Sequence, residues 1–156
     1  MRYFQKNCIY HIYNRGNRKL KICLDPEDYT KIIYLIKRFF PTQSFDILGY
    51  CIMPNHFHLL IVKVKNQKIS YSMQMLGSAY TRYFNKKYGL VGHLFQGTYK
   101  YRNVTTERQL LSTSQYIYKN PQRLSTRRYP WVHVDRKLVD AYALILFQMN
   151  STPIAY

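Results

Sequence analysis

Hydrophobic residues recur along this chain with two different periods, and each period predicts one kind of element. Four stretches are dense in β-branched and aromatic residues and end at turn signals, which is typical of strands. Arg15-Gly16-Asn17 follows the first stretch, and Pro54-Asn55 joins the second and third as a hairpin. The expected strands are residues 8–14, 45–53, 56–63 and 98–104.

Three other stretches repeat apolar residues at helical spacing. Asp25-Pro26 begins the first helix as its N-cap and first helical residue, and Pro41 ends it. Gly89 follows the second helix and Pro121 follows the third. The expected helices are residues 26–40, 70–88 and 106–120.

The order of these elements is strand, helix, strand, strand, helix, strand and helix. It predicts an α+β fold of the ferredoxin-like βαββαβ type, in which an antiparallel sheet carries helices on one face and a further helix is added at the C-terminal end. Residues 1–122 are expected to form this domain. Residues 123–156 are a basic extension of the same domain, and the apolar stretch 138–149 allows a last helix whose position the pattern does not specify.

The charge of the chain is strongly positive, because 24 Lys and Arg residues stand against 7 Asp and Glu residues and give a formal net charge of +17. Such an excess indicates a polyanionic partner, since Lys and Arg displace the counterions of phosphates. A basic surface kept for solubility is the alternative. The aromatic content of 17% suits single-stranded nucleic acid, whose bases stack on exposed rings, although many of these rings must lie in the core.

Cysteine spacing and hydropathy narrow the class of protein further. Cys8, Cys23 and Cys51 are odd in number and far apart, which speaks against a disulfide framework and a zinc site and fits a reducing cytosol. The first residues do not resemble a signal peptide, and no stretch approaches the roughly 18 apolar residues of a membrane span. We therefore expect a soluble cytoplasmic protein without a membrane partner.

Two histidines, His56 and His58, lie at the start of the third expected strand. Side chains alternate along a strand, so these imidazoles share one face about 6 to 7 Å apart and can bind one metal ion between them. Phe57, Leu59 and Ile61 then lie on the opposite face, which we expect the two crossover helices to cover. Acidic residues are scarce, and the three that lie together, Asp25, Glu27 and Asp28, are expected to serve the start of a helix, which speaks against the carboxylate cluster of a two-metal nuclease.

The last of the three expected helices carries a tyrosine on its polar side. Tyr116 shares a polar arc with Asn120, whereas Tyr118 falls on the apolar arc and is expected in the core. A phenol beside a divalent ion and a basic groove can attack a phosphate once its proton is removed. The amide oxygen of Asn120 can act as a third ligand to Mg²⁺ or Mn²⁺, together with His56 and His58.

Motifs spread over residues 10–121 form a set. They are YHIYNRGNR (10–18), DPEDY (25–29), YCIMPNHFHLLI (50–61), YTRYFNKKYGLVGHLFQGTYK (80–100) and YIYKNP (116–121). The set resembles the IS200/IS605-like Y1 transposases of the HUH nuclease class, and most closely the REP-associated tyrosine transposases. The chain departs from that pattern after residue 121, where it reads NPQRLSTRRYPW in place of NPVRAG.

The resemblance implies a transposase that cuts and rejoins single-stranded DNA, with a hairpin, in DNA transposition or REP-type hairpin processing in a prokaryotic cell. It implies that His56 and His58 bind a divalent metal, that Tyr116 attacks the phosphate to leave a 5′-phosphotyrosine and a free 3′-OH, and that Asn120 stands where relatives carry a polar third ligand. A homodimer is compatible with it, and Tyr116 then serves either its own histidines or those of a partner subunit.

Basic and polar residues beside these motifs are candidate DNA contacts, and for each a solvated surface role is the alternative. The candidates are Arg15, Arg18, Lys19, Arg82, Lys86, Lys87, Gln96, Lys100 and Arg102. A hydrogen bond within its own turn is an equally good interpretation of Gln96. His93, a lone histidine in the same turn, is expected to be structural.

Other functions remain open at this point. A catalytically inactive protein of the same fold would bind single-stranded nucleic acid without cutting it, whether as an independent module or as a decayed relative. An RNA-binding sheet would carry aromatic residues where this chain has His56 and His58, and no motif of the KGFGFVxF kind occurs. A two-histidine phosphoesterase would repeat a His-x-Thr or His-x-Ser motif, whereas this chain has one His-x-His.

Overall fold

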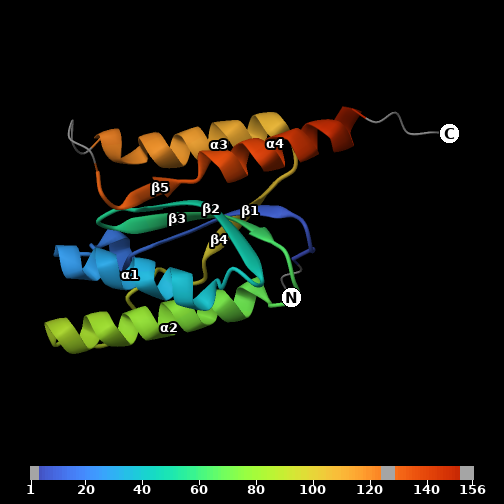
Figure 1. The fold of residues 1–156 in the computed structure, drawn as a ribbon. Coiled ribbons are helices and arrows are strands. Elements are labelled where there is room, and N and C mark those ends of the chain that lie inside the picture. The colour runs from blue at the N-terminus through green and yellow to red at the C-terminus, as the bar shows by residue number, and fades with distance from the viewer. Residues whose placement is uncertain (1–3, 124–128, 152–156) are drawn as a thin grey trace.

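One antiparallel sheet runs through the protein (Figure 1). The computed structural model describes residues 4–123 and 129–151, and within them five strands lie in the order β4-β1-β3-β2-β5. They are β1 (Ile9–Arg15), β2 (Phe45–Ile52), β3 (His56–Lys63), β4 (Lys100–Val104) and β5 (Val132–Val134). The order β4-β1-β3-β2 is that of a ferredoxin-like sheet, so the predicted fold class is confirmed.

Helices cover both faces of this sheet. α1 (Pro26–Phe39) and α2 (Ile69–Tyr88) lie below it in Figure 1, and α3 (Glu107–Lys119) and α4 (Arg136–Ser151) lie above it. Short 3₁₀ turns follow β1 at Asn17–Lys19 and α3 at Asn120–Arg123. In the described part of the chain, no helix is long and apolar enough to cross a membrane.

The helix ends follow the expected local chemistry. The Asp25 side chain accepts a hydrogen bond from the backbone N–H of Asp28, and the Asp28 side chain accepts one from the backbone N–H of Asp25, so α1 begins with a capping box. Gly89 ends α2 with a φ of 63°, a left-handed conformation that glycine adopts without strain. Thr106 caps α3 by accepting from the backbone N–H of Gln109.

The two faces of β3 belong to two separate hydrophobic cores. Phe57, Leu59 and Ile61 pack with α1 and α2, which confirms the predicted face. Leu60 and Val62 point the other way and pack with α3 and α4, whose buried apolar residues are Leu110, Ile117, Val139 and Ala143. His56 and His58 share this second face, so the histidines open toward α3.

The part of the chain after residue 128 adds two elements. β5 pairs with β2 at the sheet edge, where Cys51 lies opposite Val132. Gly49 permits this pairing, because a Cβ atom there would lie 2.9 Å from the carbonyl oxygen of His133. The pattern indicated a possible helix in 138–149 but gave no sign of β5, since three residues are too few to show a period.

The expectation that Tyr118 packs in the core is wrong. Its side chain is 48% exposed, and its ring lies 5.8 Å from the guanidinium carbon of Arg136 on α4. α3 buries only Leu110, Ser114 and Ile117, because the sheet and α4 cover a narrower stripe of the helix than the predicted arc.

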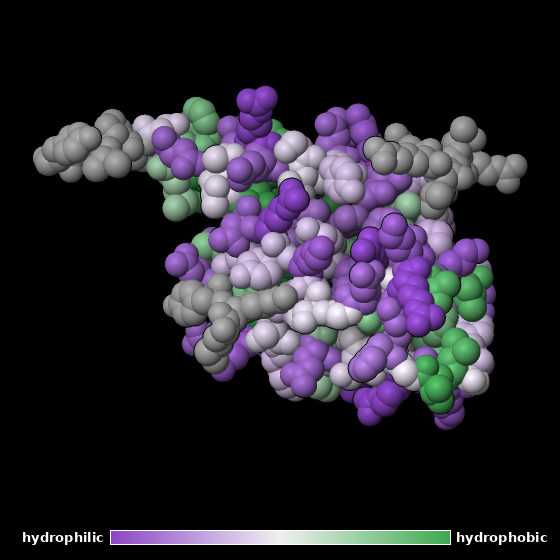
Figure 2. All heavy atoms as spheres, turned by 180° about the vertical axis from the view of Figure 1, so that it is seen from behind, coloured by the Kyte–Doolittle hydropathy of each residue, from purple (hydrophilic) through white to green (hydrophobic). Residues whose placement is uncertain are grey.

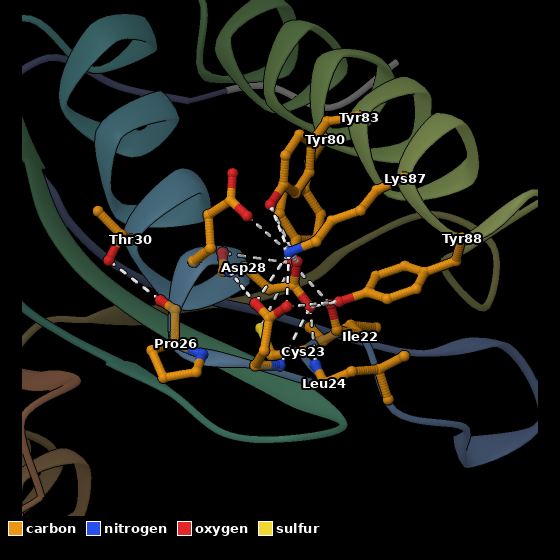
Figure 3. Close-up of polar contacts among 12 residues, drawn as sticks. Ile22, Cys23, Leu24, Pro26, Asp28, Thr30, Tyr80, Tyr83, Lys87 and Tyr88 are labelled. Carbon is orange, nitrogen blue, oxygen red and sulfur yellow. Dashed lines mark hydrogen bonds and ion pairs between the residues drawn. The ribbon is translucent and has the colours of Figure 1, made fainter.

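A polar cluster joins α1 to α2 on the face away from the histidines, and Figure 3 shows its side chains converging. At its centre the fully buried carboxylate of Asp28 accepts hydrogen bonds from Tyr83 (3.0 Å), Tyr88 (2.7 Å) and Lys87 (3.0 Å). Lys87 also lies 2.7 Å from Asp25 and 2.9 Å from Glu27. Burial opposes the charge of Lys87, but these carboxylates raise its pKa above the ordinary value of a lysine. Lys87, a candidate DNA contact, is thus held in ion pairs.

Candidate active site

Strand register brings histidines of two strands together on the face of the sheet that α3 covers. β1 pairs with β3 so that Tyr13 lies opposite His58 and Arg15 lies opposite His56. Side chains of paired residues share a face, and His11 shares it too because it stands two residues from Tyr13. The predicted same-face orientation of His56 and His58 is confirmed, with their ring centroids 5.1 Å apart.

Each imidazole of β3 has a hydrogen-bond partner at its Nδ1 atom. Nδ1 of His56 lies 2.7 Å from Oδ1 of Asn55, and Nδ1 of His58 lies 2.9 Å from Nε2 of His11. His58 is only 6% exposed, and its Nε2 atom is buried without a hydrogen-bond partner among the described residues. A buried nitrogen of this kind needs a ligand or a donor, so His58 fits a metal site at Nε2.

Burial keeps these imidazoles neutral. It lowers the pKa of His58 to about 3 and the pKa of His11 to about 4, and the nearby charge of Arg102 adds to the effect on His11. Burial also lowers the pKa of His56. A neutral imidazole is the form that binds a metal ion, so this environment favours coordination over protonation at neutral pH.

α3 brings Tyr116 to the histidines of the same chain. The Tyr116 ring centroid lies 5.4 Å from that of His58 and 6.4 Å from that of His11. Its side chain is 49% exposed and lines a pocket of about 580 Å³ together with polar residues of β1, β4 and α3. These lining residues include Tyr13, Arg102, Asn103, Gln109, Ser112 and Thr113. A phenol in this position is open to a ligand that enters the pocket.

Asn120 lies one helical turn after Tyr116, at the C-terminal end of α3. Its Nδ2 atom is buried without a hydrogen-bond partner within the described residues. The oxygen and nitrogen of an amide exchange places when the group turns over, so Asn120 can offer its oxygen to a cation. Two neutral imidazoles and an amide fit a divalent ion that takes its other ligands from phosphate and water. In residues 4–123 and 129–151, no three His, Cys, Asp or Glu side chains are grouped to hold a metal by themselves.

Several predicted DNA contacts share the face of the histidines. Lys100 of β4 lies opposite Tyr13, and Arg102 lies opposite His11. Arg15 lies on the same face, and its Nε atom donates to Oε1 of Gln96 at 2.7 Å. Gln96 is therefore held to the end of β1 and not within its own turn, because its side chain accepts from Arg15 and its backbone N–H donates to the Arg15 carbonyl.

The remaining predicted contacts lie elsewhere. Arg18 and Lys19 are exposed in the turn after β1 with φ values of 52° and 62°. Arg82 projects from α2, on the opposite side of the sheet, and lines a groove with His93. Hydrophilic side chains cover much of the face turned away from the viewer in Figure 1, as Figure 2 shows. The basic residues thus form a distributed surface, of which Arg15, Lys100 and Arg102 flank the histidines.

His11 was missed by the sequence interpretation. It stands between Tyr10 and Ile12 in a strand pattern, with no second histidine near it in the chain. The predicted topology would have placed β1 beside β3, because that is the strand order of a ferredoxin-like sheet. The register that sets His11 against His58 depends on side-chain packing across the two strands and cannot be obtained from either strand alone.

Comparisons with known proteins identify a family and a shared fold. A family model described as Transposase IS200 like matches residues 4–120. The structure of a REP-associated tyrosine transposase bound to a REP hairpin is similar with a TM-score of 0.64 and 17% identity, over 85% of this chain and 79% of that chain. A protein assigned as a transposase from Deinococcus radiodurans R1 gives a TM-score of 0.53 and 18% identity, over 76% of this chain and 95% of that chain.

A different enzyme shares the same architecture. A bacterial tRNA(His) guanylyltransferase (Thg1)-like protein in complex with GTP gives a TM-score of 0.51 and 11% identity, over 91% of this chain and 92% of that chain. Similarity at these identities shows the fold alone, and one fold serves many chemistries. No curated protein sequence matches the chain.

Proposed function

The chain belongs to the family of IS200-like transposases, and on that premise we propose that it cuts and rejoins single-stranded DNA through a covalent bond to Tyr116. One observation supports this most strongly. The exposed phenol of Tyr116 stands beside the ring of His58, whose buried Nε2 has no protein partner among the described residues. Tyr116 and His58 thus line the same pocket within a single chain.

The reaction is a transesterification at one phosphate. The oxygen of Tyr116 forms a bond to phosphorus while the bond from phosphorus to the 3′ oxygen breaks. The phenol loses one proton to solvent in the pocket, and the 3′ oxygen gains one as it leaves as a hydroxyl. The product is a 5′-phosphotyrosine, from which a 3′-OH can displace Tyr116 in the reverse direction, so that joining needs no external energy source.

The other residues of the site bind and orient the substrate. Arg102 lines the pocket, and Arg15 and Lys100 lie beside the histidines, so their charges suit the phosphates on either side of the scissile bond. His56, His58 and Asn120 would hold Mg²⁺ or Mn²⁺, which would supply Lewis-acid polarisation of a phosphate oxygen. The structurally similar REP-associated tyrosine transposase was solved bound to a REP hairpin, which supports a single-stranded substrate that carries a hairpin.

A pair of tyrosine variants tests this function. Purified protein is incubated with Mn²⁺ and a pool of single-stranded oligonucleotides that combine a hairpin with randomised flanks, and covalent adducts are separated on a denaturing gel. Tyr118→Phe is the matched control, because Tyr118 is equally exposed on the same helix and lies about 200° around it from Tyr116. We expect adducts with wild type and Tyr118→Phe, and none with Tyr116→Phe or with EDTA.

Two other outcomes would change the assignment. An adduct that persists in Tyr116→Phe shows that another residue is the nucleophile. If wild type retains the pool on a native gel but forms no adduct at any metal concentration, the chain is a single-strand-binding protein of this fold that does not cut.

A further inference from the structure

His11 makes a contact with His58 that the proposed cleavage reaction does not use. Nε2 of His11 lies 2.9 Å from Nδ1 of His58, and the two ring centroids are 5.1 Å apart with the planes tilted by 31°. This is hydrogen-bond geometry between two nitrogen atoms. His11 is half-buried, and its ring also lines the pocket of Tyr116.

A hydrogen bond between two neutral imidazoles contains one proton, so two arrangements are possible. In the first, Nδ1–H of His58 donates to Nε2 of His11, and Nε2 of His58 keeps a free lone pair. In the second, Nε2–H of His11 donates to Nδ1 of His58, and the proton of His58 sits on its Nε2. Only the first arrangement allows His58 to bind a cation through Nε2.

The surroundings favour the first arrangement. Nε2 of His58 is buried without a hydrogen-bond partner in the part of the chain that is described, so the second arrangement would bury an unsatisfied N–H group. In the first arrangement the remaining N–H belongs to His11, which borders the pocket and can meet water there. Asn55 favours the same tautomer of His56, because its Oδ1 atom can only accept a hydrogen bond and therefore keeps the proton of His56 on Nδ1.

We propose that His11 is a positioning residue, which accepts the Nδ1 proton of His58 and so directs a free Nε2 lone pair toward the metal. It takes the place that a carboxylate or backbone carbonyl occupies behind many metal-binding histidines. This inference rests on the metal-binding role of His58 in the proposed function. It assigns His11 no contact with metal or DNA.

Variants at position 11 separate positioning from simple packing. His11→Leu removes the acceptor nitrogen and fills the position with an apolar side chain of similar size. His11→Gln restores an acceptor oxygen on a side chain of similar reach. His93→Leu is the matched control, because His93 is an exposed histidine that lines the groove of α2. Thermal unfolding confirms that each variant is folded before it is compared.

Two measurements are made without DNA. The tautomer of His58 is read in metal-free, ¹⁵N-histidine-labelled protein from two-bond ¹H–¹⁵N spectra. We expect the Nδ1–H form in wild type, His11→Gln and His93→Leu, and a shift toward Nε2–H in His11→Leu. Mn²⁺ affinity, measured by calorimetry, should fall about 10- to 100-fold in His11→Leu and recover most of that loss in His11→Gln.

The inference is overturned by any of three results. These are an Nε2–H tautomer of His58 in wild type, wild-type tautomer and Mn²⁺ affinity in His11→Leu, or a wild-type protein that binds no Mn²⁺. A wild type that binds Mn²⁺ with the expected tautomer but forms no DNA adduct would instead refute cleavage alone and leave the role of His11 intact.

Discussion

The buried carboxylate of Asp28 offers a quantitative test of how α1 is held to α2. Its Oδ2 atom accepts from the backbone N–H of Leu24 at 2.8 Å and from the hydroxyl of Tyr88 at 2.7 Å. Its Oδ1 atom accepts from the hydroxyl of Tyr83 and from the ammonium of Lys87, both at 3.0 Å. Asp28→Asn preserves the size of the side chain but can present only one oxygen.

The loss of stability in Asp28→Asn depends on which carboxylate oxygen becomes the amide nitrogen. The remaining oxygen is best placed at Oδ2, because the backbone N–H of Leu24 donates there and cannot turn away. The amide nitrogen then replaces Oδ1. The hydroxyl of Tyr83 can reverse and accept, but Lys87 loses its charged acceptor and faces an N–H group. Losing one hydrogen bond to a buried charged group gives a decrease of about 2–3 kcal/mol in the free energy of unfolding.

The pH dependence of the free energy of unfolding tests the contribution of Asp28 a second time. Burial opposes the charge of Asp28, but hydrogen bonds from a backbone amide, two tyrosines and Lys87 outweigh it and hold the pKa of Asp28 below its ordinary value. A lowered folded pKa means that the contribution of Asp28 is complete above the unfolded value of about 4 and is lost as the pH falls through the folded value. The deficit of Asp28→Asn should therefore narrow below about pH 4.

Urea denaturation of wild type, Asp28→Asn and Asp140→Asn measures both effects. Asp140 is exposed on α4, so its substitution should change the free energy of unfolding by no more than about 0.5 kcal/mol. The reasoning fails if Asp28→Asn loses no more than Asp140→Asn, or if its deficit stays constant or grows between pH 7 and pH 3. Mn²⁺ affinity should be unchanged in folded Asp28→Asn, since the cluster lies across the sheet from the histidines.

Three further expectations concern DNA contact, the sheet edge and helix α2. Arg102→Gln, beside the histidines, should weaken binding of single-stranded DNA and reduce the slope of log affinity against log salt by about 1. Arg82→Gln should cause a smaller loss of affinity and a smaller change of slope. Fluorescence anisotropy at several salt concentrations distinguishes the two variants. Gly49→Val should lower the free energy of unfolding by about 1–3 kcal/mol, because its Cβ atom would meet the His133 carbonyl oxygen at 2.9 Å. Gly77→Ala should instead raise it by about 0.5–1 kcal/mol, since a Cβ atom there meets nothing within 4 Å and α2 gains a better helix former; urea denaturation tests both signs.

Local patterns predicted the elements that carry strong local chemistry. Asp25-Pro26 fixed the start of α1, and Pro54-Asn55 separated two strands whose observed bounds differ by at most one residue from the expected ones. The alternation of His56, Phe57 and His58 was sufficient to assign their faces, because the period of a strand leaves no other choice. These features depend on a few neighbouring residues, which is why the sequence alone contains them.

Features that depend on distant packing were missed or wrong. The width of the buried stripe on α3 is set by how the sheet and α4 cover it, so Tyr118 was assigned to the core although it is exposed. β5 exists because Gly49 lets a distant segment approach β2. His11 joins His58 only through the register of β1 and β3. In each case the decisive contact joins residues far apart in the chain.

The proposed nucleophile and the proposed ligands come from different elements, so the geometry between them depends on how α3 lies on the sheet. Leu110 and Ile117 of α3 share a core with Leu60 of β3, the strand that also carries His58. Val139 of α4 is buried in the same core, so α4 supports α3 on the side away from Tyr116. Helix α4, which carries none of the proposed catalytic residues, therefore helps to set the distance between Tyr116 and His58, and loosening α4 should impair cleavage before it impairs metal binding.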